Sequence, residues 1–296
     1  MKLQEKFKVS SFVLTDPCYG SCDIADADAE RLGAEIAFNI GHSISMNKIG
    51  TRTFMINAFD DVSFDKVLDE AVKTLKPHKK IGVSTSSQHI HKLDQIVDYF
   101  KNNGIEANVG TGKGQLKDGQ VFGCEFYPAF ELKDKVNAFA FLGQSRFHAI
   151  GVGLSTGKPT YMIDPYFNEV KEINTIAAEL QKKATLAIYR ARDANNFGLI
   201  IGLKEGQIML KRSLKIKNEF EKFGKKVHLL AQREITSDKL VILKDIDAFI
   251  QTACPRISID DHSFAKPILS MPQAEALIKI YKGEEIGDFL MKSHWL

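Results

Sequence analysis

Short β-branched apolar runs alternate along the chain with longer stretches in which apolar residues recur every three or four positions. The short runs predict strands at 79–85, 105–110, 197–203 and 226–231. The longer stretches predict helices at 88–104 and 207–224, each closed by a glycine that can adopt the left-handed conformation of a C-cap. Repeated strand–helix–strand units build parallel sheets covered by helices, so the predicted fold class is α/β.

The chain also repeats itself. Three segments align, at 34–57, 136–164 and 247–270. In each, an apolar strand that we expect to be buried is followed by a polar loop and a second apolar strand, and the first strands contain Phe38, Phe141 and Phe249. The phenylalanines are 103 and 108 residues apart, a usual domain size. We therefore expect three similar parallel-sheet α/β domains, arranged with pseudo-threefold symmetry.

The first unit is short. Only 37 residues precede Phe38, whereas 62 and 52 residues separate the opening strand from the aligned phenylalanine in the second and third units. We expect the first domain to lack its opening strand and helix, and its sheet to be one strand smaller than the others unless a partner covers the edge. The expected domains are 1–75, with Cys22, 76–168, with Cys124, and 169–296, with Cys254.

The composition excludes several classes of protein. Hydrophobic residues make up 44% and charged residues 26% of 296 positions, which excludes disordered, collagen-like and coiled-coil chains. A net charge of +3 is too small to indicate nucleic acid by itself. No apolar run reaches the roughly 18–20 residues of a membrane span, and Asp16 and Pro17 end the apolar stretch near the N-terminus too early for a signal peptide. We therefore expect a cytoplasmic protein without membrane contact.

The cysteines are the strongest chemical signal. In the cytoplasm thiols stay reduced, so Cys18, Cys22, Cys124 and Cys254 are free, buried, metal-bound or catalytic and not a disulfide framework. A single cysteine is most often a small buried apolar residue. Three of these four, however, each follow a predicted strand in a loop marked by glycine or proline: Cys22 after 11–15, Cys124 after the second strand of its unit and Cys254 after the third.

Three units around a common axis could bring these thiols together. Three thiolates suit an iron–sulfur cluster with one open iron, or a zinc ion completed by histidine or water. No motif of a zinc protease or zinc finger is present. Open α/β sheets bind ligands beyond the carboxyl ends of their strands. The loops expected to converge there on one cleft are 41–43, 84–89, 143–148 and 252–256.

Six motifs in order along the chain carry a family resemblance. They are 16–26, 39–43, 84–93, 119–124, 141–166 and 252–261. Together they resemble the archaeal diphthamide synthases, which are radical 2-(3-amino-3-carboxypropyl)histidine synthases. The resemblance implies three similar α/β domains, a homodimer and a 4Fe-4S cluster held by Cys22, Cys124 and Cys254. Cys18 has no counterpart in the family pattern and is interpreted as a spare thiol, although its spacing from Cys22 leaves a ligand swap conceivable.

The resemblance also implies a reaction. In this family the 3-amino-3-carboxypropyl group of S-adenosylmethionine is transferred to imidazole C2 of a histidine in translation elongation factor 2, the first step of diphthamide biosynthesis. An electron from the reduced cluster breaks the bond between sulfonium and γ-carbon, and methylthioadenosine leaves. The implied partners are elongation factor 2 and an electron donor, with no direct contact to nucleic acid.

Other site residues follow less directly. Arg256, beside Cys254, suits the methionine carboxylate because a guanidinium matches a carboxylate fork. Gln88, Ser145 and His148 are candidate cofactor contacts because their loops flank the expected cleft, and each could equally be a hydrogen bond that orders its loop. The alternatives are a zinc-dependent enzyme using the same cysteines, a non-catalytic scaffold subunit, and a generic three-domain α/β binding protein whose cysteines lie far apart.

Overall fold

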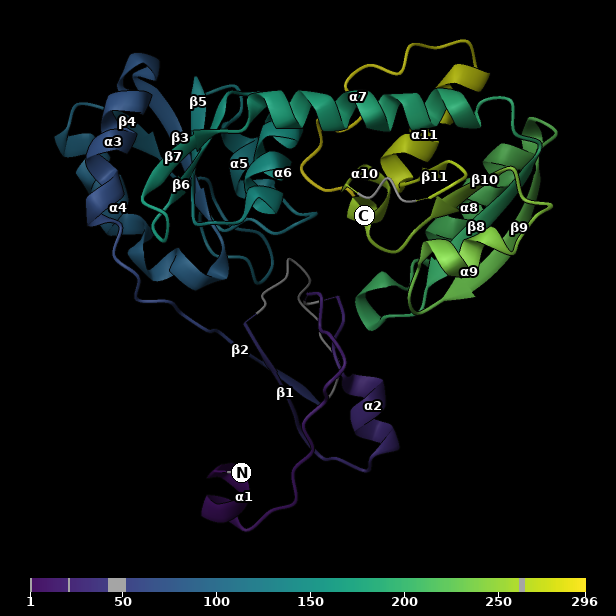
Figure 1. Cartoon of the computed structure of the whole chain (residues 1–296), viewed down its shortest axis with the longest axis horizontal. Helices are drawn as coiled ribbons and strands as arrows, with labels where there is room; N and C mark the ends of the chain where they lie inside the picture. The colour runs from purple at the N-terminus through teal and green to yellow at the C-terminus, as the bar shows by residue number, and fades with distance from the viewer. Residues whose placement is uncertain (1, 21, 42–51, 261–263) are drawn as a thin grey trace.

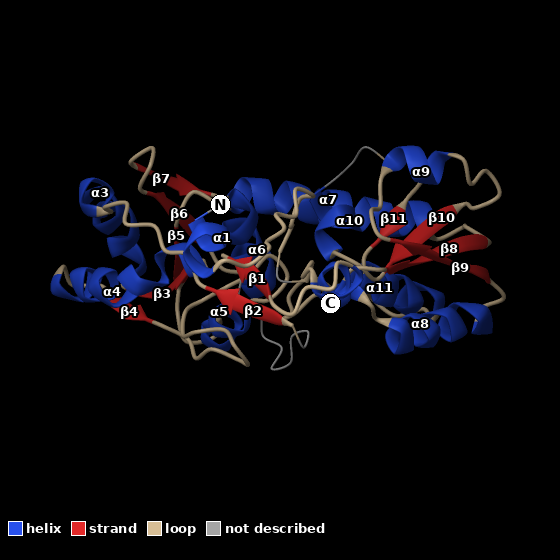
Figure 2. Cartoon of the chain, turned by 90° about the horizontal axis from the view of Figure 1, so that it is seen from below, coloured by secondary structure: helices blue, strands red, loops and turns tan. Residues whose placement is uncertain are grey.

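The computed structural model describes residues 2–20, 22–41, 52–260 and 264–296. Within these ranges the chain forms three sheets, one for each unit of the repeat (Figure 1). The two larger sheets lie at opposite ends of one long helix, α7 (Asn174–Ala191), in both views (Figures 1 and 2). The small first sheet lies on the side of the molecule away from α7 (Figure 1).

The strands and helices divide among the units in chain order. The strands are β1 (Ala37–Ile40), β2 (Thr53–Ile56), β3 (Lys80–Thr85), β4 (Glu106–Asn108), β5 (Ala138–Leu142), β6 (Thr160–Asp164), β7 (Glu169–Glu172), β8 (Asn196–Gly202), β9 (Lys226–Gln232), β10 (Ala248–Gln251) and β11 (Ile268–Leu269). The other α-helices are α1 (Lys2–Phe7), α2 (Asp26–Arg31), α3 (Asp65–Leu75), α4 (Leu93–Asn102), α5 (Tyr127–Leu132), α6 (Arg146–Thr156), α8 (Leu210–Lys222), α9 (Ser237–Val241), α10 (Pro255–Asp260) and α11 (Met271–Tyr281). Short 3-10 turns are η1 (Lys76–His78), η2 (Ser87–Lys92) and η3 (Glu205–Gln207).

The second and third units share one strand order, which confirms the α/β repeat. Their parallel strands run β4-β3-β5-β6 and β9-β8-β10-β11, and β7 adds to the second sheet antiparallel to β6. In its described residues the first unit contributes the parallel pair β1–β2, equivalent to the last two strands of each larger sheet. The first sheet is therefore two parallel strands smaller than the others, where we expected one.

Two expectations for the first unit are wrong. Phe141 and Phe249 are buried in β5 and β10, but Phe38 in β1 is 55% exposed, because a two-stranded sheet is too narrow to bury its own side chains. The expected strand at 11–15 is an irregular segment, in which Val13 is 81% exposed. An apolar run becomes a strand only where a neighbouring strand completes its backbone hydrogen bonds.

The larger sheets share a hydrophobic core. One buried cluster joins Phe139 of the second unit to Phe197 and Leu269 of the third, and α7 bridges them by packing on α6, α10 and α11. A second cluster covers the other face of the β3–β6 sheet and includes α3 and α4. Helix α3 lies within the range 1–75 but packs on β6 and β7. The domain boundaries stay a prediction, and this contact favours a first boundary before Asp65.

Local sequence explains the ends of the helices nearest the site. Helix α6 begins at Ser145, whose hydroxyl accepts a hydrogen bond from the His148 N–H, and it ends at Gly157, where φ is +66°. The expected helix 88–104 starts as the 3-10 turn η2, continues as α4 and is closed by Gly104 at φ +81°. Among the residues that the structure describes, no helix is both long and apolar enough to cross a bilayer.

Candidate metal centre

The strand order of the larger sheets places two crevices at their carboxyl edges. In the third unit the chain goes from β8 to β9 on one side of it and then to β10 on its other side, and in the second unit it goes from β3 to β4 and then to β5 in the same way. The loops that follow the first and third strands therefore leave the sheet in opposite directions, and a ligand can bind between them. In the third unit these loops are 203–209 after β8 and 252–254 after β10. In the second unit they contain η2 after β3 and residues 143–145 after β5. Gln88, Ser145 and Cys254 lie on these loops, His148 and Arg256 lie in the first turns of the helices that follow them, and Cys124 lies on the loop after β4.

Cys254 lies in a tightly hydrogen-bonded turn between β10 and α10. The side chain of Gln251, at the end of β10, accepts from Ala253 N–H at 2.9 Å and donates to the Cys254 carbonyl at 2.8 Å. The same carbonyl accepts from Ile257 N–H at 3.0 Å. A buried glutamine that makes both bonds fixes the backbone of the loop, and with it the direction of the cysteine.

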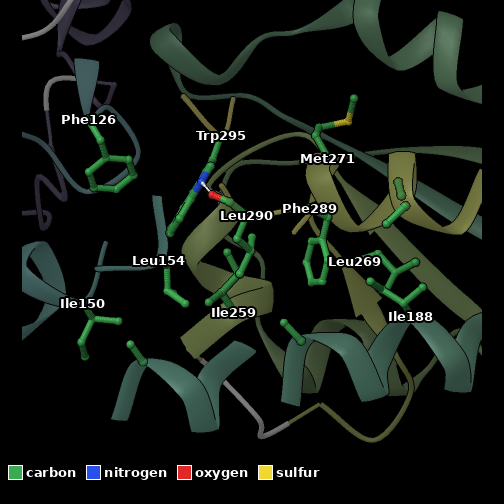
Figure 3. Close-up of a cluster of buried hydrophobic side chains, with 14 of the residues drawn as sticks. Phe126, Ile150, Leu154, Ile188, Ile259, Leu269, Met271, Phe289, Leu290 and Trp295 are labelled. Carbon is green, nitrogen blue, oxygen red and sulfur yellow. Dashed lines mark hydrogen bonds between the residues drawn. The ribbon is translucent and has the colours of Figure 1, made fainter. Parts of the chain in front are cut away.

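Cys124 lies in a second fixed loop. Val121 N–H donates to the Thr85 carbonyl at 2.9 Å, which lays this segment along the end of β3. The Cys124 carbonyl accepts from Trp295 N–H at 3.1 Å, so the C-terminal segment of the chain closes over the loop. Trp295 is fully buried, packs 4.8 Å from Phe126 between ring centroids, and donates from its indole to the Leu290 carbonyl at 2.8 Å (Figure 3).

Cys22 reaches the same region on a loop of the first unit that docks on the third. Gly206 N–H donates to the Cys22 carbonyl at 2.9 Å, and Gln207 Nε2 donates to Cys22 Sγ at 3.3 Å. Lys204 forms ion pairs of 2.8 Å with both Asp23 and Glu234. Burial opposes the lysine charge, but the hydrogen bonds to these two carboxylates prevail and raise the pKa of Lys204.

The second unit also touches this loop, beside its own cysteine. A Cβ added at Gly20 would lie 2.9 Å from the ring of Phe122, two residues before Cys124. The loop of the first unit is thus held between the Cys124 loop and the β8 edge.

The three thiols affect one another electrostatically. Burial and, to a smaller extent, a negative charge on Cys254 raise the pKa of Cys22 to about 11, against the opposing hydrogen bond from Gln207. Burial raises the pKa of Cys124 well above its ordinary value, with added repulsion from Cys254 and Cys22. Burial also raises the pKa of Cys254, whereas the Arg256 guanidinium opposes that rise. These mutual charge effects indicate that the three cysteines lie in one region, and their assignment as a ligand set stays a prediction.

Such a set of donors fits a polynuclear metal group. Three buried thiols that repel one another as thiolates need positive charge to deprotonate, and a bound metal supplies it. Within the described residues, no three His, Cys, Asp or Glu side chains are arranged so that they could hold a metal ion. The three thiols are sulfur ligands only, the donor type of iron–sulfur clusters.

Arg256 lies beside the thiols, as expected, but it is already partly engaged. Its Nε donates to Asp260 Oδ2 at 2.6 Å, and its guanidinium carbon lies 3.8 Å from the centre of the Phe147 ring. The residue is only 5% exposed, and burial lowers its pKa. Its Nη1 has no hydrogen-bond partner among the described residues. One edge of the guanidinium therefore keeps a donor to offer to a ligand.

The remaining candidates divide into two groups. Ser145 and His148 lie next to Arg256 through Phe147, and Ser145 Oγ lies 2.6 Å from His148 Nδ1. Gln88 is exposed on η2, and its carbonyl accepts from Asp60 N–H at 2.9 Å, so the observed bond orders its loop. His42 of the loop 41–43 lies outside the described residues.

Cys18 differs from the other three thiols. It is exposed, and its Sγ lies 3.4 Å from the carbonyl oxygens of Gly20 and Asp23 in its own loop. Burial raises its pKa, but none of the other cysteines contributes to the shift. This position agrees with its interpretation as a spare thiol.

Sequence reasoning missed the residues that hold the cysteine loops. Gly206 and Gln207 contact Cys22, Lys204 pairs with Asp23 beside it, and Trp295 contacts Cys124. A signal for the first three was available, because they directly follow the first strand of the third unit at its crevice. A second signal was the single tryptophan of the chain, close to its C-terminus.

Comparisons with known proteins agree with this architecture. The fold and the site define a class of protein: an α/β chain of three similar units, each of which contributes one cysteine to the same region. Residues 1–288 match the family model described as "Putative diphthamide synthesis protein". The chain therefore belongs to the diphthamide synthesis family.

Individual relatives cover most of the chain. A Pyrococcus horikoshii protein named 2-(3-amino-3-carboxypropyl)histidine synthase is 30% identical over 97% of this chain and 83% of its own length. The synthase subunit 1 of Schizosaccharomyces pombe is 29% identical over 94% of this chain, which spans only 66% of that relative. A crystal structure of Dph2 from P. horikoshii with a 4Fe-4S cluster superposes with a TM-score of 0.86 at 29% identity, covering 98% of this chain and 84% of that one.

Proposed function

We propose that this chain catalyses the first step of diphthamide biosynthesis. It would transfer the 3-amino-3-carboxypropyl group of S-adenosylmethionine to imidazole C2 of a histidine in translation elongation factor 2. The observation that carries the proposal is that the Cys22 loop packs against the third unit and against Phe122 beside Cys124, with electrostatic repulsion among Cys22, Cys124 and Cys254 in support. The family to which the chain belongs and the names of its relatives also support the proposal.

In this proposal the three cysteines hold a 4Fe-4S cluster. When bound, the cluster supplies the low-potential electron that cleaves a sulfonium bond and the open iron that engages the methionine end of S-adenosylmethionine. The chain's own contribution is to bury the three thiolates away from water, on loops fixed by Gln251, Trp295 and Gly206. Burial matters here because an enclosed site protects a reactive carbon fragment from side reactions before it reaches the histidine.

Arg256 has a binding role in this proposal. Its Nη1 is buried and available, so it can donate to the carboxylate of the methionine moiety while Asp260 and the Phe147 ring keep the guanidinium in place. Ser145 and His148 lie on the neighbouring helix end and would contact the same ligand. Gln88 remains a candidate contact at the edge of this cleft.

The proposal includes the setting of the reaction. We expect a homodimer in the cytoplasm that receives electrons from a separate donor and docks elongation factor 2 near the three cysteines. The methylthioadenosine that leaves S-adenosylmethionine is the small-molecule product to follow.

The test begins with metal content. The chain is purified and reconstituted without oxygen, and iron and acid-labile sulfide are measured. About four of each per chain, with broad brown absorption, are expected. Reduced protein given S-adenosylmethionine and elongation factor 2 should then release methylthioadenosine and add the aminocarboxypropyl mass to one histidine peptide.

Matched variants sharpen this test, because the chain offers two cysteines four positions apart. Cys22→Ala should lose both iron and product, whereas Cys18→Ala should keep both. Zinc in place of iron would favour the zinc-dependent enzyme. A full cluster without any release of methylthioadenosine would favour the scaffold subunit.

A further inference from the structure

The loop that carries Cys22 has few apolar anchors. Cys18 is exposed and Tyr19 is 66% exposed, and the sheet that follows the loop leaves Phe38 and Phe54 more than half exposed. The cysteine loops of the other two units, in contrast, are hydrogen-bonded to strands of their own sheets. The position of Cys22 therefore depends on its polar contacts with the third unit.

One side chain dominates these contacts. Lys204 is 4% exposed, and its Nζ lies 2.8 Å from Asp23 Oδ2 and 2.8 Å from Glu234 Oε1. The same ammonium lies 4.2 Å from the centre of the Tyr19 ring. The lysine therefore touches the loop on both sides of Cys22, once through a buried carboxylate and once through an aromatic face.

The two carboxylates that pair with Lys204 differ in their exposure to solvent, and this difference indicates which unit would move if the lysine charge were lost. The Asp23 side chain is only 9% exposed, whereas that of Glu234 is 46% exposed. A buried carboxylate that loses its cation must move toward water, but an exposed one is solvated where it stands. Loss of the Lys204 charge would therefore move the loop of the first unit and leave the third unit in place.

We infer that Lys204 is a positioning residue for Cys22. Its ammonium holds Tyr19 and Asp23, on either side of Cys22, against the third unit, so that the thiol of the first unit lies in the region of Cys124 and Cys254. Gly206 and Gln207 make the closing bonds to Cys22 itself, and Lys204 supplies the charge that draws the loop to them. The inference rests on the proposed function only in naming Cys22 as a cluster ligand.

The test follows the reactivity of each thiol in the metal-free full-length chain. Without oxygen, iodoacetamide alkylation of Cys22, Cys124 and Cys254 is timed by mass spectrometry, and fragmentation of the shared peptide separates Cys18 from Cys22. Lys204→Met keeps the length of the side chain and removes its charge. We expect Cys22 to react at least about tenfold faster in this variant, with Cys124 and Cys254 unchanged, because only the loop opens.

Three further variants serve as controls. Lys222→Met removes a charge from the exposed face of α8, where the lysine pairs with Glu219, and should change none of the thiols. Lys204→Arg keeps the charge and should restore most of the protection of Cys22. Asp23→Asn removes the partner charge, and combining it with Lys204→Met should be no worse than the more severe single variant, because the two residues act as a pair.

Two results would overturn the inference. One is an unchanged alkylation rate of Cys22 in both Lys204→Met and Asp23→Asn. The other is an equal rise for all three thiols, which would mean that Lys204 stabilises the whole chain and does not position one loop. Iron content after reconstitution is measured in parallel. If the unchanged chain binds no iron, the proposed function fails, while the alkylation rates still decide the role of Lys204.

Discussion

A single methyl group at Gly206 should displace Cys22. Gly206 N–H donates to the Cys22 carbonyl at 2.9 Å, and a Cβ built at this glycine would lie 2.5 Å from Cys22 Cα and 2.9 Å from Cys22 Cβ. Ordinary van der Waals contact begins at 3.4 Å. Gly206 is not among the glycines with positive φ, so alanine fits the backbone conformation and the collision is the whole effect.

The size of the effect follows from the overlap. The segments around Gly206 and Cys22 must separate by about 1 Å. Overpacking of this kind lowers the free energy of unfolding by about 1–3 kcal/mol. A misplacement of about 1 Å at a reacting centre can lower a rate by about a hundredfold. For Gly206→Ala we therefore expect incomplete binding of iron and release of methylthioadenosine lowered by about that factor.

The assay compares this variant with Gly224→Ala. Gly224 has φ +74° and no atom within 4 Å of an added Cβ, so alanine there costs about 1 kcal/mol of backbone strain far from the cysteines. Iron, sulfide and methylthioadenosine are measured in both variants beside the free energy of unfolding. The reasoning is refuted if Gly206→Ala binds iron and turns over like the unchanged chain, or if Gly224→Ala loses as much.

Three other predictions follow from the same contacts. Cys124→Ala and Cys254→Ala should abolish methylthioadenosine release, and full activity in either would remove that cysteine from the proposed ligand set. Trp295→Ala should lower the free energy of unfolding by about 3–5 kcal/mol in a denaturant titration followed by circular dichroism, and Trp295→Phe by clearly less, because the fully buried indole packs on Phe126. Burial, together with the charges of Arg212 and Lys113, lowers the pKa of His294 to about 4. The unfolded chain takes up this proton near pH 6.5, so stability should fall as the pH falls from about 6.5 to about 4, by on the order of 2–3 kcal/mol. His294→Gln should flatten that slope, and an equal slope in the variant would contradict the assignment.

The sequence predicted the fold well where the local hydrophobic pattern agrees with the environment of the strand in its sheet. The strands β3 and β8 were predicted nearly to their ends, because a central parallel strand is apolar over most of its length, and the edge strand β9 was found from its run of apolar residues after a helix-closing glycine. The three-fold repeat was visible because the equivalent strands β5 and β10 keep a phenylalanine in the same place. The carboxyl edges of the sheets followed from topology, and the choice of three cysteines came from their glycine- or proline-marked loops and from the family resemblance.

The predictions failed where the structure of a segment depends on residues that are distant in the sequence. Residues 11–15 have the composition of a strand but no strand to pair with, and Phe38 has the composition of a core residue without enough sheet around it. Lys204 resembles any loop lysine in the sequence. Its role depends on Asp23, 181 residues away, and a contact at that separation has no local pattern.

The core shared by the second and third units has a consequence for how the chain opens. Helix α7 contributes buried residues such as Ala184 and Ile188 to a cluster that contains side chains of both sheets, so we expect the two sheets to unfold together. Cys124 and Cys254 therefore belong to one cooperative body, and the spacing between them persists until global unfolding. Cys22 belongs to the small first unit, for which we expect a smaller free energy of local unfolding. Solvent and reagents consequently reach the three thiols in an order set by the fold: the thiol of the first unit becomes accessible long before the other two.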